Sequence, residues 1–344
     1  MKEFNSYLSC ELYKIYRKKT LLIMAIVILA IILVVMGLSF LLNYIFTSAG
    51  VVTVNGDYEY QLAQLRVQLE MIESQMDASF INRLLLKNEK YQILAQISMY
   101  EYFVENNVPA GACTPYSLGE VGIGGEYDYY KFTCFAMSSL MTVIICFMIV
   151  IACRNTVGEY NNGTMKMQLM RPVNKQIFYT AKWLAVYIVS EAVLLFSMLA
   201  SFMIGVMAFG GYSADVVIVA NASSVIRVSP LAALFISFLM KSVKIFMLLQ
   251  LTMFINSLSK KMSLALTLNI LLTLVEIGVL IETVASLAYI GFAGFFMNIN
   301  WENALSLTGP SLRGMSLWTM IPISLVWTGL FMGLGYRNFA RKEI

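Results

Sequence analysis

Six apolar stretches, each long enough to cross a lipid bilayer, constrain this chain more than any other feature. A helix rises 1.5 Å per residue, so about 20 mostly apolar residues span the hydrocarbon core of a membrane. Stretches of that length cover residues 21–46, 132–153, 177–209, 231–256, 262–283 and 317–336. Only 13% of the 344 residues are charged and 59% are hydrophobic, whereas a soluble domain usually has about 25% charged residues. We therefore predict an all-α, polytopic membrane protein with six transmembrane helices.

The basic residues predict the orientation of these helices, because Lys and Arg concentrate on the cytoplasmic side of membrane proteins. The segments before residue 21, from Arg154 to Lys182, at Lys260 and Lys261, and after Tyr336 hold fifteen of the 24 Lys and Arg residues. Residues 47–130 hold only four, against eleven acidic residues. We predict a multi-pass protein of the cell membrane with both termini cytoplasmic. Residues 154–176, 257–261 and 337–344 then lie inside, and residues 47–131, 210–230 and 284–316 lie outside.

Three segments outside the spans have patterns of their own. In residues 1–20, Phe4, Leu8 and Leu12 recur at helical spacing among charged residues, which predicts an amphipathic elbow helix on the inner surface. Residues 47–131 predict an extracellular helical module between the first and second spans, with apolar seams at Leu62, Leu65, Leu69, Ile72 and Met76, and at Ile93, Ile97, Tyr100 and Val104. Residues 284–297 are apolar but too short to cross, which predicts a re-entrant segment.

The acidic excess of the extracellular module leaves two explanations open. One explanation is the avoidance of positive charge on outer loops. Alternatively, the acidic residues attract a cationic ligand such as an antimicrobial peptide.

The residue types argue against catalysis or metal binding by this chain. There is no histidine, which is the commonest general base near neutral pH and the commonest metal ligand. The sequence has no Gly-Lys dipeptide and hence no Gly-x-x-x-x-Gly-Lys-Ser/Thr phosphate loop for ATP. No cysteine pair has metal-ligand spacing. We predict no catalytic, cofactor-binding or metal site, and no nucleic-acid partner.

The segment between the second and third predicted spans is the most informative one for function. Residues 154–176, the coupling segment, are polar and charged and are longer than a connection to the next span needs to be. They predict a short helix bounded by Gly158 and Pro172, lying at the membrane surface and docking to something outside the membrane.

Residues in and after the coupling segment resemble the permease subunits of type-2 ABC exporters. The resemblance rests on Glu159-Tyr-Asn-Asn-Gly163-Thr164, Leu169, Pro172-Val173, Lys175 and Lys182-Trp183-Leu184. The elbow helix, the six spans and the re-entrant segment agree with that family. The resemblance implies an all-helical permease that works with a second permease, of the same or a related chain, and with two ATPase subunits. ATP and Mg would bind to those partner ATPase chains.

The resemblance also implies a substrate class and a set of coupling residues. The substrate would be amphipathic or lipid-like, for example a peptide antibiotic exported for resistance or immunity. Within the coupling segment, Glu159 would pair with a basic residue of the ATPase, Gly163 would allow a kink or a close backbone approach, and Thr164 would cap the helix that follows. Lys166 would lie in the ATPase contact, and Pro172 would stop the helix before the third span. The alternative is an ordinary inner loop whose charges face water.

Charged residues within the predicted spans form a second informative set: Glu191, Lys241, Lys244 and Glu276. Burial in a bilayer costs about 2.5–3.5 kcal/mol for Lys or Asp at a helix centre, so each should face protein or water. Lys244 and Glu276 lie at matching depths of about 21–23 Å, which predicts that they face each other. The set forms either a polar pathway or gate, or structural pairs between helices.

Two other functions are compatible with parts of the sequence. One is an ion-coupled secondary transporter that uses Lys244 and Glu276, although the sequence has no evident internal repeat. The other is a membrane sensor, which would need a signalling domain longer than the eight residues after Tyr336.

Overall fold

The computed structural model describes residues 2–17, 19–48, 58–78, 86–108, 113–115, 128–164, 175–211, 215–220, 224–274 and 317–341. The helices are α1 (Lys2–Arg17), α2 (Thr20–Ser48), α3 (Tyr58–Ala78), α5 (Lys87–Glu105), α6 (Tyr129–Cys153), α7 (Glu159–Asn161), α9 (Lys175–Phe209), α10 (Pro230–Leu258), α11 (Met262–Leu274) and α15 (Leu317–Arg341), with a π-helical turn η1 (Arg154–Gly158). The strands are β1 (Cys113–Pro115), β2 (Asp215–Ala220) and β3 (Ser224–Val228).

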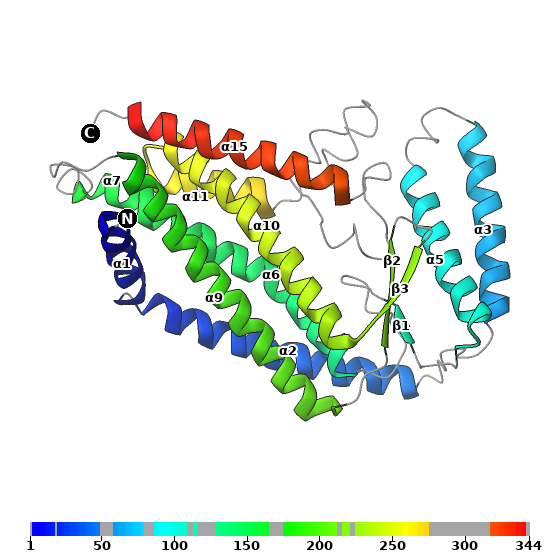
Figure 1. The fold of residues 1–344 in the computed structure, drawn as a ribbon. Coiled ribbons are helices and arrows are strands. Elements are labelled where there is room, and N and C mark those ends of the chain that lie inside the picture. Colours follow the sequence, from blue (N-terminus) through cyan, green and yellow to red (C-terminus); the bar gives the residue numbers. More distant parts are fainter. Residues whose placement is uncertain are drawn as a thin grey trace.

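The long helices form one bundle that holds both chain ends at the same side (Figure 1). Helix α2 runs along one side of the bundle and α15 along the other, with α6, α9, α10 and α11 between them. We call the side with the chain ends the termini end. The sheet lies at the opposite side, between the bundle and the pair α3 and α5, and we call that side the sheet end.

Four helical stretches among the described residues are long and apolar enough to cross a membrane: Thr20–Leu41, Tyr129–Asn161, Lys175–Phe209 and Pro230–Leu258. They overlap the first four predicted spans. Helix α11 is apolar over the 13 residues described, and α15 covers the last predicted span with 25 residues. The six-span count stays a prediction, and the predicted re-entrant segment lies outside the described residues.

The core of the bundle is apolar and closely packed around α6 and α9. Its fully buried side chains include Ile28 and Ile32 of α2, Leu140 of α6 and Leu249 of α10. Gly205 of α9 lets α9 approach α6, because a Cβ atom there would lie 3.0 Å from Phe132 Cδ1 and 3.2 Å from the Tyr129 carbonyl oxygen.

A three-stranded sheet corrects the all-α prediction. Strands β2 and β3 form an antiparallel hairpin, in which Ile218 pairs with Ile226, and β1 pairs with β2 in parallel, with Cys113 opposite Asp215. The runs Asp-Val-Val-Ile-Val-Ala and Ser-Val-Ile-Arg-Val are rich in β-branched residues, which favour strands. Residues 210–230, which were predicted to be an extracellular loop, contain two of the three strands. The chain is predominantly helical with one small sheet.

Helices α3 and α5 pack on each other through the seams that the sequence predicts. Ile72 of α3 and Ile93 and Ile97 of α5 are buried together, with Leu65 and Leu69 beside them. Helix α5 is in turn attached to the sheet, since Met99 and Phe103 share a buried cluster with Val217 of β2. The placement of this pair outside the cell stays a prediction.

Candidate functional site: a buried charge cluster at the termini end

The second membrane-length helix extends beyond its predicted end at Cys153. Helix α6 continues through η1 and α7 as one helical stretch to Asn161. Gly158, which was expected to bound a separate helix, lies buried inside this stretch. That expectation was wrong, because Arg154–Gly158 stays helical with a π-type widening. Such π-turns within helices frequently mark functional sites.

The stretch ends in a tight turn at Gly163. The backbone φ angle of Gly163 is +70°, a conformation that glycine adopts without the steric cost that other residues pay. The Asn162 N–H donates to the Gly158 carbonyl at 3.1 Å and the Gly163 N–H to the Tyr160 carbonyl at 3.2 Å. The Thr164 hydroxyl donates to the Glu159 carbonyl at 3.1 Å, so Thr164 satisfies the end of the preceding helix. The helix that Thr164 was expected to cap, with Lys166 and Pro172, lies outside the described residues.

The turn also places α7 against the connection between α10 and α11. In the amide orientation that satisfies both groups, the Asn161 side chain donates to the Lys260 carbonyl at 2.6 Å and accepts from the Met262 N–H at 3.2 Å. The end of the α6–α7 stretch is therefore hydrogen-bonded to the start of α11.

Four charged side chains meet where α1, α7 and α9 come together, and we call them the charge cluster: Glu11, Lys14, Glu159 and Lys182. Lys182 of α9 is 0% exposed. Its Nζ donates to Glu159 Oε2 at 2.6 Å, to the Asn155 carbonyl at 2.9 Å and to Glu11 Oε1 at 3.2 Å. These three bonds use all three donors of the ammonium group.

Lys14 of α1 completes the cluster from the more exposed side. Its Nζ lies 2.8 Å from Glu11 Oε1 and 3.2 Å from Glu159 Oε1. The cluster thus holds two positive and two negative charges. Such charge balance matters because an uncompensated buried charge is strongly destabilising.

The ion pairs change the acidities of the two α1 residues. Burial by itself would raise the pKa of Glu11, but attraction to Lys182 and hydrogen bonds from Lys14 and Lys182 outweigh burial and hold the pKa below its ordinary value of 4.5. Burial by itself would lower the pKa of Lys14, but hydrogen bonding and attraction to Glu11 and Glu159 raise it above 10.5. Both groups are therefore charged at neutral pH.

Glu159 was expected to pair with a basic residue of another protein, and in the structure it pairs with two lysines of its own chain. Its carboxylate is buried and is engaged by Lys14 and Lys182 of the same chain. No local sequence pattern predicts the contact with Lys14, because Lys14 is 145 residues away from Glu159 in the chain. A signal was present in Glu11, because it lies at helical spacing from the apolar residues Leu8 and Ile15 of the elbow helix.

Aromatic side chains support the cluster on its apolar side. Lys182 Nζ lies 4.8 Å from the centre of the Phe178 ring, within the range of a cation–π contact. Phe178 also contacts Tyr7 of α1, with ring centres 6.5 Å apart, and Phe339 of α15, at 6.1 Å. The charge cluster is thus joined to the last helix of the chain.

A polar triad lies next to η1, where α6, α10 and α11 meet. The Cys153 thiol donates to Asn256 Oδ1 at 3.2 Å, and Asn269 Nδ2 donates to the same oxygen at 3.0 Å. All three side chains are buried. A cavity beside the triad is lined by Thr156, Val157, Tyr160, Tyr179, Met253, Asn256, Ser257 and Phe339.

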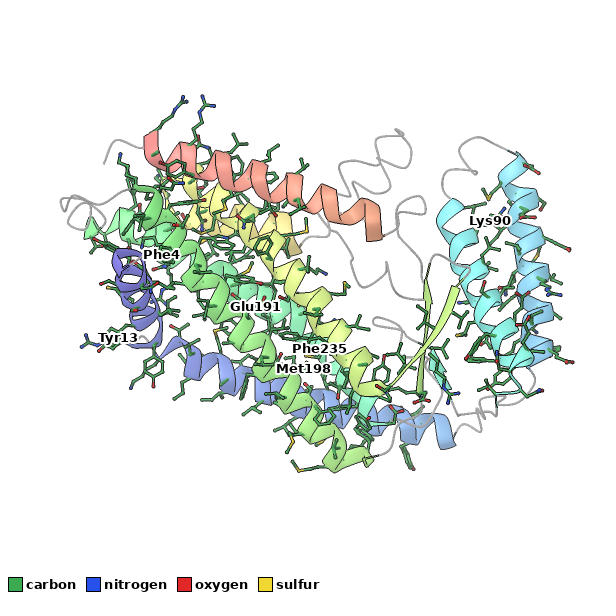
Figure 2. The ribbon with its side chains drawn as sticks, viewed as in Figure 1. Phe4, Tyr13, Lys90, Glu191, Met198 and Phe235 are labelled. Atoms are coloured by element: carbon green, nitrogen blue, oxygen red, sulfur yellow. The ribbon has the colours of Figure 1, made fainter. Side chains whose placement is uncertain are left out.

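The charged residues predicted within the spans do not all fall in one place. Lys241 of α10 is fully buried and Lys244 is partly buried, and both make contacts within the chain. Glu276 lies outside the described residues, and so does the predicted pair Lys244–Glu276. Glu191 lies about halfway along α9 (Figure 2). Within the described residues, no three Cys, Asp or Glu side chains gather in a way that would hold a metal ion.

Comparisons with known proteins agree with a transporter. A family model described as ABC-2 family transporter protein matches residues 8–344. The chain is similar to the uncharacterized protein YhcI of Bacillus subtilis (strain 168), with 23% identity over 256 residues, which cover 72% of this chain and 75% of that protein.

Proposed function

Because the chain belongs to the ABC-2 family of transporter proteins, we propose that it is the transmembrane permease subunit of an ATP-driven exporter in the cell membrane. The chain itself is not the enzyme. Separate ATPase subunits bind ATP and Mg on the cytoplasmic side, where both termini lie. A second permease, of the same or a related chain, completes the path through the bilayer. The family match favours this function over an ion-coupled transporter.

The family match carries the proposal, and the route of coupling starts from the contact between Glu159 and Lys182, 2.6 Å apart at the end of the coupling segment's helical part. The ATPase contact follows directly, in residues 162–174, which include Gly163, Thr164, Lys166 and Pro172. A displacement of that contact is passed to α7. Glu159 then passes it to α9 and α1, because the cluster cannot separate without stranding buried charge.

Two further contacts spread the same motion over the bundle. Asn161 connects α7 to the start of α11, and Phe178 connects the cluster to α15 through Phe339. Lys182 lies about 10 Å along α9 from Lys175, the first residue of that helix, because a helix rises 1.5 Å per residue. A shift at this end therefore tilts a helix long enough to cross the membrane. In this way ATP-driven closure of the ATPase would change the packing of the spans.

The proposed substrate is an amphipathic or lipid-like molecule, such as a peptide antibiotic, moved out of the membrane or cytoplasm for resistance or immunity. Support comes from the exposed apolar surface of the spans, to which such a molecule would have access from the lipid. Exposed side chains of this kind include Leu33 and Val34 of α2 and Leu199 and Met203 of α9.

Site-directed crosslinking tests the proposal. In a variant without the five native cysteines, Asn162→Cys and Lys166→Cys should crosslink to an ATPase subunit that co-purifies with the tagged chain. Lys261→Cys, also at the termini end and exposed, is the matched control. Co-purification without crosslinks from Asn162→Cys and Lys166→Cys, but with crosslinks from Lys261→Cys, would assign the ATPase contact to the α10–α11 connection. Failure of any ATPase to co-purify would refute the exporter function.

A further inference from the structure

Glu191 of α9 is a charged residue at the middle of a membrane-length helix. It lies 16 residues after Lys175 and 18 before Phe209, so it is about 24 Å and 27 Å from the two ends of α9. Ionisable residues at this depth are expensive and by default mark a functional site. The charge cluster is far from Glu191, because Lys182 lies more than two turns closer to the termini end.

The carboxylate of Glu191 has hydrogen-bonding capacity that the described residues leave unused. It is placed beside the hydroxyl groups of Tyr187 and Ser242, which are themselves 3.3 Å apart. Its Oε1 atom is buried but has no hydrogen-bond partner in the described structure. No ion pair of Glu191 occurs among the described residues either. Each such buried group in a native structure needs an explanation.

An aromatic platform lies one turn from the carboxylate. The rings of Trp183 and Tyr187 are stacked, with centres 5.6 Å apart and planes 6° apart. Phe246 of α10 meets both rings edge-on, at 5.5 Å. Ring faces attract cations, so the platform and the carboxylate favour the same kind of group.

Apolar side chains beside the site are exposed along the seam between α9 and α10. Ile188 and Leu195, one turn to either side of Glu191 on the same helix face, are 39% and 46% exposed. On α10, Leu239 precedes Ser242 by three residues and is 44% exposed. An apolar molecule can therefore lie along this seam with a charged group at Glu191.

We infer that this seam is a binding site for a lipophilic cation, meaning an amine or quaternary ammonium group on an apolar body. We call it the cation site: Trp183, Tyr187, Glu191, Ser242 and Phe246. The positive group binds the free Glu191 oxygen and the aromatic platform, and the apolar body lies against the exposed side chains of the seam. In the exporter, the site would recognise the positive charge of the substrate, and this role rests on the proposed export function.

Binding of a matched pair of probes to the full chain in lipid nanodiscs tests the inference without any ATPase. The probes are trimethylammonium-diphenylhexatriene, which is a lipophilic cation, and neutral diphenylhexatriene. Both accept energy from tryptophan, and Trp183 is part of the site. Excess tetraphenylphosphonium competes for the site, so the energy transfer that it abolishes measures specific binding. In the wild-type chain, tetraphenylphosphonium should reduce energy transfer to the cationic probe but not to the neutral probe.

Variants then identify the carboxylate. Glu191→Gln should weaken binding of the cationic probe by roughly tenfold or more, because a contact to a charged partner is lost, whereas Glu191→Asp should retain it. The same Glu-to-Gln change at Glu101, an exposed residue paired with Arg66, should have no effect. If Glu191→Gln does not fold, Ile188→Lys serves instead, since it adds a competing cation on an exposed position one turn away.

Three results would overturn the inference. One is equal specific binding of the neutral and the cationic probe, and another is unchanged cation binding in both Glu191→Gln and Ile188→Lys. The third is a chain-to-chain crosslink by a bismaleimide from Leu195→Cys, because a second copy would then cover the seam. Any of these would leave the proposed function standing if an ATPase still co-purifies and crosslinks to the coupling segment.

Discussion

Replacing Lys182 by methionine removes the centre of the charge cluster at nearly constant volume. The change deletes three hydrogen bonds and leaves Glu11 and Glu159 with Lys14 as the one cation that pairs with them among the described residues. Removing one partner of a buried ion pair costs about 3–5 kcal/mol. Stabilities of native proteins are only about 5–15 kcal/mol, so we expect Lys182→Met to lose a large share of the free energy of unfolding.

A double-mutant cycle separates the pair from the loss of packing. In Lys182→Met combined with Glu159→Gln, Lys14 and Glu11 remain as a balanced pair, so we expect a loss of about 1–2 kcal/mol relative to wild type. Glu159→Gln alone also removes one partner of the buried pair, at a cost of about 3–5 kcal/mol. The two single losses together should then exceed the loss of the double variant by at least about 4 kcal/mol, which is the expected coupling between the two positions. The measurement is the free energy of unfolding of the full chain in mixed micelles, followed by circular dichroism during SDS titration.

Lys14→Met is the matched control, because Lys14 is one-quarter exposed and its ion pairs are partly screened by solvent. It should cost about 1 kcal/mol or less. If the effects of Lys182→Met and Glu159→Gln add to within about 0.5 kcal/mol, the two residues do not act as a pair and the coupling mechanism fails with them.

Three further predictions follow from the same end of the bundle and from its core. Because the pKa of Glu11 is lowered, its contribution to stability is complete above pH 4.5 and is lost as the pH falls below that value. Because the pKa of Lys14 is raised, its contribution is complete below pH 10.5 and is lost above that value. Acid unfolding should therefore be less steep in Glu11→Gln than in wild type. Gly163→Val should cost about 1–2 kcal/mol because of the positive φ angle and should reduce transport per ATP hydrolysed, whereas Gly37→Ala, with nothing within 4 Å of the added methyl group, should show no strain beyond the ordinary effect of alanine in a helix. Gly205→Val should overpack α6 against α9 and destabilise by about 1–3 kcal/mol in the same SDS titration, and an unchanged midpoint would show that the two helices are not in close contact there.

The sequence predicted the helices well because their signals are local. The apolar runs that became α2, α9 and α10 exceed the length of a buried helix in a soluble protein, and the seams of α3 and α5 have helical spacing. The strands were missed because residues 210–230 were read only as a connection between spans, although β2 contains four β-branched residues in a row. A parallel pairing of β1 with β2 joins residues 102 positions apart, such as Cys113 and Asp215, and no local pattern contains it.

The candidate site was predicted by residue but not by role. Glu159 and Lys182 belong to the motif that resembles exporter permeases, yet the sequence offered no reason to pair them with each other or with α1. Their partners are fixed by the helical continuation through η1, which turns the Glu159 side chain inward toward Lys182. Without that continuation, a charged residue after an apolar span is most simply assigned to the surface.

This difference changes how a permease would transmit force. A surface ion pair with the ATPase is worth little and is exchanged readily with water, so it would act as a recognition contact that can slip. A buried cluster with all three lysine donors engaged is costly to open, so α1, α7 and α9 move together or not at all. Residues 162–174 then make the recognition contact with the ATPase. When these residues move, the charge cluster transmits the movement to the spans. On this reasoning, variants in residues 162–174 should change ATPase affinity, whereas variants of Lys182 should leave ATPase affinity unchanged and lower the number of substrate molecules moved per ATP. Equal loss of ATPase affinity in both sets would mean that the cluster is part of the docking surface after all.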